Sequence, residues 1–162
     1  MSTSAVSLPA RGALWAAAAR ILVPALWLGL VIGISFIEAP LKFTAPGITL
    51  QLGLGIGRRV FLAMNCVEVL FFILLLAGCI KRGIDKAFGW AVAAAGFLLL
   101  VKTAVIRPGL SRRTDAVLAG NFEGGSLWHY AYIGAEGLLA AVLVLLLVLA
   151  VRRWVRVPRN ES

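Results

Sequence analysis

Long apolar runs alternate with short polar segments along this chain. An α-helix of about 20 residues crosses the roughly 30 Å hydrocarbon core of a bilayer, and backbone groups in lipid must find hydrogen-bond partners within their own segment. Four of the apolar runs reach this length, so the pattern predicts four transmembrane helices. The predicted helices cover about 14–37, 59–80, 87–106 and 128–151.

The composition supports a membrane protein. Of the 162 residues, 61% are hydrophobic and 14% are charged, whereas soluble domains carry about 25% charged residues. A soluble core with four such runs would leave too little polar surface. We therefore expect an all-α, four-helix transmembrane bundle with up-down-up-down order, forming one integral membrane domain over 1–162. We place it in the cell membrane as a multi-pass protein, with the lipid bilayer as its immediate partner.

The formal net charge of +9 changes this picture little, because the basic residues flank the apolar runs. Anionic lipid head groups attract Lys and Arg at such positions. Lys and Arg are more numerous in the N-terminal segment, in "KRGIDK" at 81–86 and in the C-terminal tail than in the other two loops, which predicts cytoplasmic termini. No basic patch is interleaved with aromatic residues, so nucleic acid is not an expected partner.

The two loops on the predicted outer side are the longer ones. In the first, 39–57, Pro40 and Pro46 disfavour helix around them, and we expect a close-packed or interfacial crossover. The second, 107–126, is polar and rich in glycine. Within it, Ser111–Leu118 is predicted to form a short helix capped by the Ser111 side chain. On the first predicted helix, Gly29 and Gly33 form a GxxxG motif, which favours close helix packing.

Ionisable and amide side chains interrupt the apolar runs at a few positions. In "AMNCVEVLFF" at 63–72, Asn65 and Glu68 lie inside the second run, and Lys102 and Glu136 lie inside the third and fourth. All four fall in the halves of the helices nearest to the longer loops, whereas the opposite halves are almost entirely Leu, Val, Ala and Ile. A charge at the centre of a membrane helix costs about 2.5–3.5 kcal/mol on insertion scales. We therefore expect these side chains to face the interior and to pair.

Helical spacing also predicts that these side chains face one another in the bundle interior. Asn65 and Glu68 share one stripe of their helix, as do His129, Tyr132 and Glu136, because residues three and four apart lie on one face. Two carboxylates that share the Lys102 ammonium leave one carboxylate short of positive charge. The predicted ligand- or ion-binding residues are Glu68, Glu136, Asn65, Lys102, His129, Tyr132 and Glu38, the last of which ends the first helix.

Two interpretations of these residues remain open. They form either a buried clasp that fixes helix register, or a site for a ligand or ion, since intramembrane ionisable residues are functional candidates by default. His129 with Glu68 and Glu136 would offer one nitrogen and two oxygens, a set that suits zinc or a similar cation. One histidine and two methionines argue against a copper or haem site. No metal or cofactor is assigned.

Signatures of catalysis are missing from the sequence, which has no HExxH, no Cys-His couple and no nucleophile elbow, so we do not expect an enzyme. The first functional hypothesis is a site in the outer half of the bundle that binds or transports a small cation, a proton or a small ligand. The alternative is a non-catalytic accessory or structural subunit of a larger membrane complex. Four short helices leave little room for a gated pathway, which favours the accessory role or a homo-oligomer.

Three segments carry a family resemblance: "WLGLVIGISFIEAPLKF" at 27–43, "GRRVFLAMNCVEVLFF" at 57–72 and "SLWHYAYIGAEG" at 126–137. The Trp-x-Gly, the Ala-Pro followed by a Phe, the Asn-x-x-Glu and the His near the start of the last helix resemble a family of small four-helix membrane proteins of uncharacterised function. That family is distantly related to copper-resistance protein D. The resemblance implies a four-helix bundle, but its copper link transfers poorly to a chain this poor in His and Met. DoxX-like proteins are a second, lower-ranked resemblance.

Overall fold

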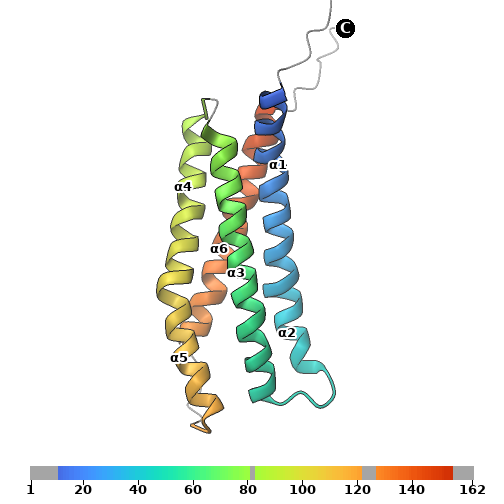
Figure 1. Ribbon diagram of the computed structural model, residues 1–162, viewed down its shortest axis with the longest axis vertical. Coiled ribbons are helices and arrows are strands. Elements are labelled where there is room, and N and C mark those ends of the chain that lie inside the picture. The colour runs from blue at the N-terminus through green and yellow to red at the C-terminus, as the bar shows by residue number, and fades with distance from the viewer. Residues whose placement is uncertain (1–10, 81–82, 122–126, 155–162) are drawn as a thin grey trace, which may run out of the picture.

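Four long helical stretches run antiparallel to one another in the computed structural model, which describes residues 11–80, 83–121 and 127–154 (Figure 1). Each stretch is long and apolar enough to cross a membrane. The predicted all-α, four-helix, up-down-up-down bundle is therefore confirmed, and it is compatible with a multi-pass membrane protein. The four stretches are Leu14–Thr44, Leu50–Ile80, Lys86–Leu118 and Leu127–Arg153.

Two of the stretches are α-helical throughout, and the other two change their helix type part of the way along. The uniform ones are α3 (Leu50–Ile80) and α6 (Leu127–Trp154). The first stretch consists of α1 (Arg11–Val31), the π-helix η1 (Ile32–Glu38), α2 (Ala39–Leu41) and the 3-10 turn η2 (Lys42–Thr44). The third consists of α4 (Lys86–Val101), the π-helix η3 (Lys102–Ile106) and α5 (Arg107–Leu118).

The bundle has two distinct ends. The start of α1 and the end of α6 lie together at one end, which we call the terminal end (Figure 1). The short helices α2 and α5 lie at the opposite end, which we call the α5 end. Helix α6 packs against α1 and α4, and α1 also packs against α3. The predicted outer loops both fall at the α5 end.

Both outer loops are much shorter than predicted. The segment predicted as the first crossover loop, 39–57, is helical except for a turn near Gly47, because α3 begins at Leu50. The second predicted loop, from 107 onward, starts as helix: α5 continues directly from η3. Ser111 therefore lies inside a helix and does not cap one, and the residue before α5 is Ile106. The remainder of that loop, 122–126, lies outside the described residues.

The predicted loops are helical because two π-helical segments accommodate proline. Proline lacks an N–H group, and its ring collides with the carbonyl four residues earlier in an α-helix. Here the residue before each proline bonds five residues back: the N–H of Ala39 donates to the Ile34 carbonyl, and that of Arg107 donates to the Lys102 carbonyl. The wider π-helical turn supplies a backbone hydrogen bond next to the position where proline removes an α-helical one. The chain therefore stays helical through Pro40 and Pro108. Such π-bulges frequently occur at functional sites.

The terminal half of the bundle holds the main apolar core. Trp27, Leu75, Ala95, Leu139 and Leu143 are fully buried there. Apolar packing does not orient helices strongly in lipid, since lipid tails are as apolar as leucine, so close approach depends on small residues and polar contacts.

Helices α1 and α3 approach closely at Gly78, where an added Cβ would lie 2.9 Å from the Cβ of Ala19. The GxxxG motif does not serve this purpose. A Cβ at Gly29 or Gly33 would meet no described atom within 4 Å, so the prediction that this motif packs closely within the chain is wrong.

Candidate functional site

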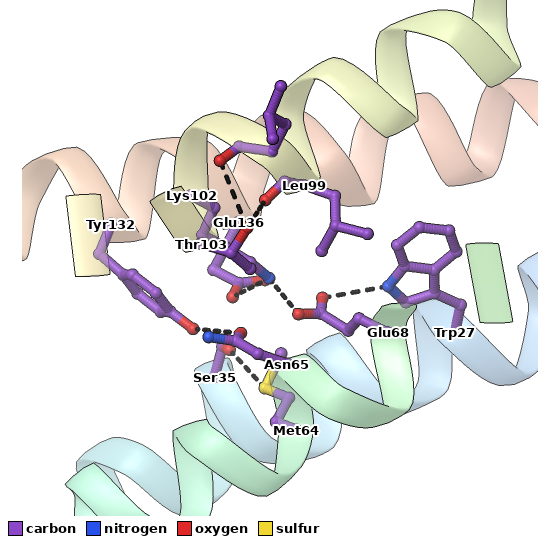
Figure 2. Close-up of polar contacts among 11 residues, drawn as sticks. Trp27, Ser35, Met64, Asn65, Glu68, Leu99, Lys102, Thr103, Tyr132 and Glu136 are labelled. Atoms are coloured by element: carbon purple, nitrogen blue, oxygen red, sulfur yellow. Dashed lines mark hydrogen bonds and ion pairs between the residues drawn. The ribbon is translucent and has the colours of Figure 1, made fainter. Parts of the chain in front are cut away.

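A buried ion cluster joins three helical segments in the half of the bundle toward the α5 end (Figure 2). The Lys102 ammonium, at the start of η3, lies 2.9 Å from Oε1 of Glu136 on α6 and also pairs with Oε2 of Glu68 on α3. All three side chains are almost completely buried. The structure thus brings together the three charged residues that the sequence pattern predicted to pair.

Neutral donors and acceptors surround these charges. The indole N–H of Trp27 on α1 donates to Oε1 of Glu68 over 3.0 Å, so the first long stretch also reaches the cluster. The Tyr132 hydroxyl lies 3.5 Å from the side-chain oxygen of Asn65 and donates to it. The Lys102 nitrogen lies 5.7 Å from the centroid of the Tyr132 ring, which adds a cation–π contact.

The π-helical turn helps to position Lys102. Its carbonyl accepts the N–H of Arg107, five residues later, so the lysine stands where the α-helical register ends. The next side chain, Thr103, donates its hydroxyl to the Leu99 carbonyl over 2.7 Å. The buried ammonium is therefore carried by the residue that begins the π-helical segment ahead of Pro108.

Two polar atoms of this region remain without a partner. Within the described part of the chain, the Nδ2 atom of Asn65 and the Oε2 atom of Glu136 are buried and have no hydrogen-bond partner. Leaving a buried polar group unsatisfied costs about 1–3 kcal/mol, and more for a charged group. Buried groups of this kind commonly bind water or an ion, so the unpartnered oxygen of Glu136 is the atom on which the chemistry of the cluster depends.

The cluster also carries an excess of negative charge. Two carboxylates and one ammonium sum to −1 when all three are ionised. An uncompensated charge in a low-dielectric interior is expensive, and proteins avoid it by pairing or neutralising the group. Within the described residues, no second cation contacts either carboxylate. The arrangement therefore favours the addition of one positive charge.

Two small cavities lie between the cluster and the α5 end. The inner one, of about 40 Å³, is lined by Glu136 together with Ser35, Tyr132 and His129. A second cavity, of about 90 Å³, lies farther out, and both share the walls formed by Phe61, Leu110, His129 and Tyr132. A site of this size has room for water, which needs at least about 10–15 Å³. Toward the terminal end the cluster is backed by buried apolar side chains.

The mouth of the outer cavity is cationic. Lys42, Arg58 and Arg107 line it. Lys42 lies 3.3 Å from the Glu38 carboxylate, one helical turn away, and Arg58 pairs with Asp115. Three positive and two negative groups leave a net positive charge at this mouth, in contrast to the negative cluster behind it.

The predicted site residues thus divide into two groups. Glu68, Glu136, Lys102, Asn65 and Tyr132 come together at the cluster. His129 forms part of the cavity wall, and Glu38 pairs with Lys42 at the mouth, so these two belong to the approach to the cluster. Among the described residues, no group of three or more His, Cys, Asp or Glu side chains could hold a metal ion. The hypothetical metal set of His129 with Glu68 and Glu136 is therefore not assembled.

The sequence pattern missed two polar residues on α1. In the sequence, Trp27 stands out only as part of the family motif, although an indole N–H deep in a membrane helix needs an acceptor. Arg20 belongs by its charge to the basic N-terminal segment, but its side chain is buried and its Nε donates to the Gly78 carbonyl over 3.0 Å. Arg20 is thus a buried polar residue in the half of the bundle that is otherwise almost entirely apolar.

No family model matches this chain, and no curated protein and no solved structure matches it either.

Proposed function

We propose that this chain is a polytopic membrane protein whose Glu68–Lys102–Glu136 cluster takes up and releases a proton through the cavities at the α5 end. The observation that carries the proposal is the unbalanced charge of the cluster, with one buried carboxylate oxygen of Glu136 unpartnered beside a cavity. One added proton makes the cluster neutral.

The surroundings favour a proton over a divalent metal cation. The net positive mouth near Lys42, Arg58 and Arg107 repels a doubly charged ion more strongly than a proton. A divalent metal ion would also need several oxygen or nitrogen ligands with free lone pairs. Around Glu68, one carboxylate oxygen is taken by Trp27 and the other by Lys102. A proton needs only one oxygen and can move along hydroxyl, imidazole and water groups.

The side chains between the cluster and the mouth suit such a route. Tyr132 and His129 line both cavities, and each carries a group that donates and accepts hydrogen bonds. Proton relays in membrane proteins use chains of acidic and imidazole groups of this kind. In this proposal, protons exchange on the α5 side alone, because apolar packing backs the cluster on the other side.

A second function is supported by a different observation. The cluster links α1, α3, η3 and α6 through Trp27, Glu68, Lys102 and Glu136, which is the arrangement that a structural clasp requires. In that case the chain would be an accessory subunit or a homo-oligomer, and the cluster would hold a fixed charge state. The two proposals differ in whether either carboxylate changes its protonation.

Infrared difference spectroscopy on the purified protein in neutral detergent separates them. Spectra are recorded between acidic and alkaline buffer, and the carbonyl stretch of a buried carboxylic acid is followed. We expect a titrating band in the wild type that is lost or shifted in Glu136→Gln and Glu68→Gln but retained in Glu38→Gln. Glu38 is the control because it is an acidic residue of the mouth, outside the cluster.

The wild-type spectrum is decisive even when a variant folds poorly. A wild-type protein with no titrating band from a buried carboxyl group overturns proton exchange and leaves the clasp. A band that persists unchanged in both cluster variants also overturns it, because the titrating group then lies elsewhere.

The orientation and the location of the chain belong to the same proposal. The distribution of Lys and Arg supports cytoplasmic termini, which would direct the α5 end and its cavities to the extracytoplasmic face of a cell membrane. Membership in the small four-helix family suggested by the sequence motifs also stays a prediction, and it implies a fold without an established chemistry.

A further inference from the structure

A second, larger depression lies on the outside of the bundle at the α5 end, between α3 and the third helical stretch. Its volume is about 560 Å³. Three arginine side chains line it, two from α3 and one from the start of α5, and hydroxyl groups and apolar side chains complete its walls. The residues on which the argument depends are Arg58, Arg59, Arg107, Ser111, Leu62 and Leu118.

The positive charge of this groove is only partly balanced. Arg58 pairs with Asp115 on α5. In the part of the chain that the structure describes, no acidic side chain pairs with Arg59 or Arg107. Two guanidinium groups that line the same groove therefore lack a carboxylate partner among the described residues. The planar fork of arginine matches the oxygens of a phosphate group and binds them in pairs, which makes arginine a preferred residue for phosphate recognition.

The position of the groove indicates where that phosphate comes from. Arg58 and Arg59 lie inside α3, within the stretch Leu50–Ile80 that is long and apolar enough to cross a membrane, so their charges lie beside a surface that lipid can cover. Leu62, one turn deeper, is 47% exposed, and Leu118 on the other wall is 43% exposed. A basic pocket between helices, next to exposed apolar side chains, suits a lipid with its head group on the arginines and its acyl chains along the helix surface.

We propose that this groove binds the phosphate head group of an anionic phospholipid, held by Arg59 and Arg107 and flanked by the Ser111 hydroxyl. Arg58 and Arg107 also line the mouth of the cavity that leads toward Glu136, so the bound lipid would lie beside that mouth. This assignment concerns the outer surface of the bundle and does not depend on proton exchange at the buried cluster.

Electron paramagnetic resonance with spin-labelled lipids tests the proposal. The full chain is reconstituted in phosphatidylcholine vesicles that contain a trace of spin-labelled phosphatidylglycerol or, in a parallel sample, spin-labelled phosphatidylcholine. We expect the protein to immobilise the anionic label more strongly. A juxtamembrane arginine contributes enough attraction for about a fivefold preference. The variant Arg59→Gln/Arg107→Gln should therefore lose most of the selectivity, and Arg59→Gln alone should lose part of it.

The matched control is Arg112→Gln/Arg152→Gln, which removes two exposed arginines that do not line the groove. Equal selectivity in this control and in the groove variant would overturn the assignment, because the attraction would then come from overall charge. Arg59 is exposed, so its single variant is expected to fold and keeps the test decisive.

A further arm adds inorganic phosphate to the wild-type vesicles. The lipid site is expected to retain its label. Displacement of the anionic label by inorganic phosphate at an ionic strength matched with chloride would assign the groove to a soluble phosphate and would overturn the lipid proposal.

Discussion

The indole nitrogen of Trp27 lies 3.0 Å from Oε1 of Glu68, on the opposite side of the carboxylate from the Lys102 ammonium. One carboxylate is thereby held by a neutral donor from α1 and a charged donor from η3 (Figure 2). The four long helical stretches are connected through this single group and its neighbours. The predictions that follow concern this connection, the close approach of α1 and α3, and the access to the cluster.

Replacement of Trp27 by Phe should lower the free energy of unfolding by about 1 kcal/mol, because one buried hydrogen bond to a carboxylate is lost while most of the ring volume is kept. Reversible unfolding in mixed detergent micelles measures the change. Trp90→Phe is the matched control, since the Trp90 side chain is 76% exposed. Equal stability of the two variants would show that the Trp27 contact contributes nothing.

Replacement of Lys102 by Met should destabilise the protein by about 3–5 kcal/mol, because it leaves two buried carboxylates without their cation. A triple variant that also carries Glu68→Gln and Glu136→Gln should recover much of this loss, since no unpaired charge remains. The same unfolding assay measures both, with the exposed Lys86→Met as the control. A triple variant as unstable as the single variant would contradict the charge argument.

Gly78→Leu should destabilise the protein by about 1–3 kcal/mol, the usual cost of overpacking. A Cβ at this position already lies 2.9 Å from Ala19 and 3.7 Å from the Ala16 carbonyl, so a larger side chain forces α1 away from α3. Gly29→Leu is the matched control on α1, where a Cβ meets nothing within 4 Å. We expect that control to unfold at the wild-type denaturant concentration or above it. If Gly29→Leu were instead less stable than Gly78→Leu, α1 and α3 would have to meet elsewhere.

Cysteine labelling should report the route to the cluster. In a background that carries Cys66→Ser and Cys79→Ser, Ser35→Cys places a thiol on the wall of the inner cavity, whereas Leu143→Cys places one in the apolar core. A small, membrane-impermeant thiosulfonate reagent should modify the first and leave the second intact. The anionic form should react faster than the cationic form, because the mouth is net positive. Equal protection of both thiols would show that the cavities are closed to water.

The charged core of the site could be predicted from the sequence because the physics of lipid leaves few alternatives. Glu68, Lys102 and Glu136 lie within apolar runs at similar depth, and a buried charge must find its opposite. The helix order followed from run length and loop length. Neither prediction requires knowledge of how one helix is rotated about its axis relative to another.

The parts of the fold and site that the sequence does not predict depend on contacts that hydrophobic periodicity does not encode. The partner of the Trp27 N–H is fixed by which face of α1 meets α3, and the burial of Arg20 is fixed by its Gly78 carbonyl acceptor. The first predicted loop is too long because Pro40 is expected to disfavour helix, whereas the chain stays helical through Pro40 and Pro108. The π-helical turns that precede them restore the backbone bonding, and only the three-dimensional path of the chain reveals them.

Arg20 and Trp27 lie roughly two helical turns apart on α1, and both bind α3, the first through a carbonyl and the second through a carboxylate. A shift of α1 along its axis by one turn would break both hydrogen bonds at once. The apolar packing of the neighbouring leucines would change little. Together, the two contacts therefore set the axial position of α1 relative to α3. The height of the first span is thus set relative to α3 by a pair of directional bonds, in addition to any match with the surrounding lipid.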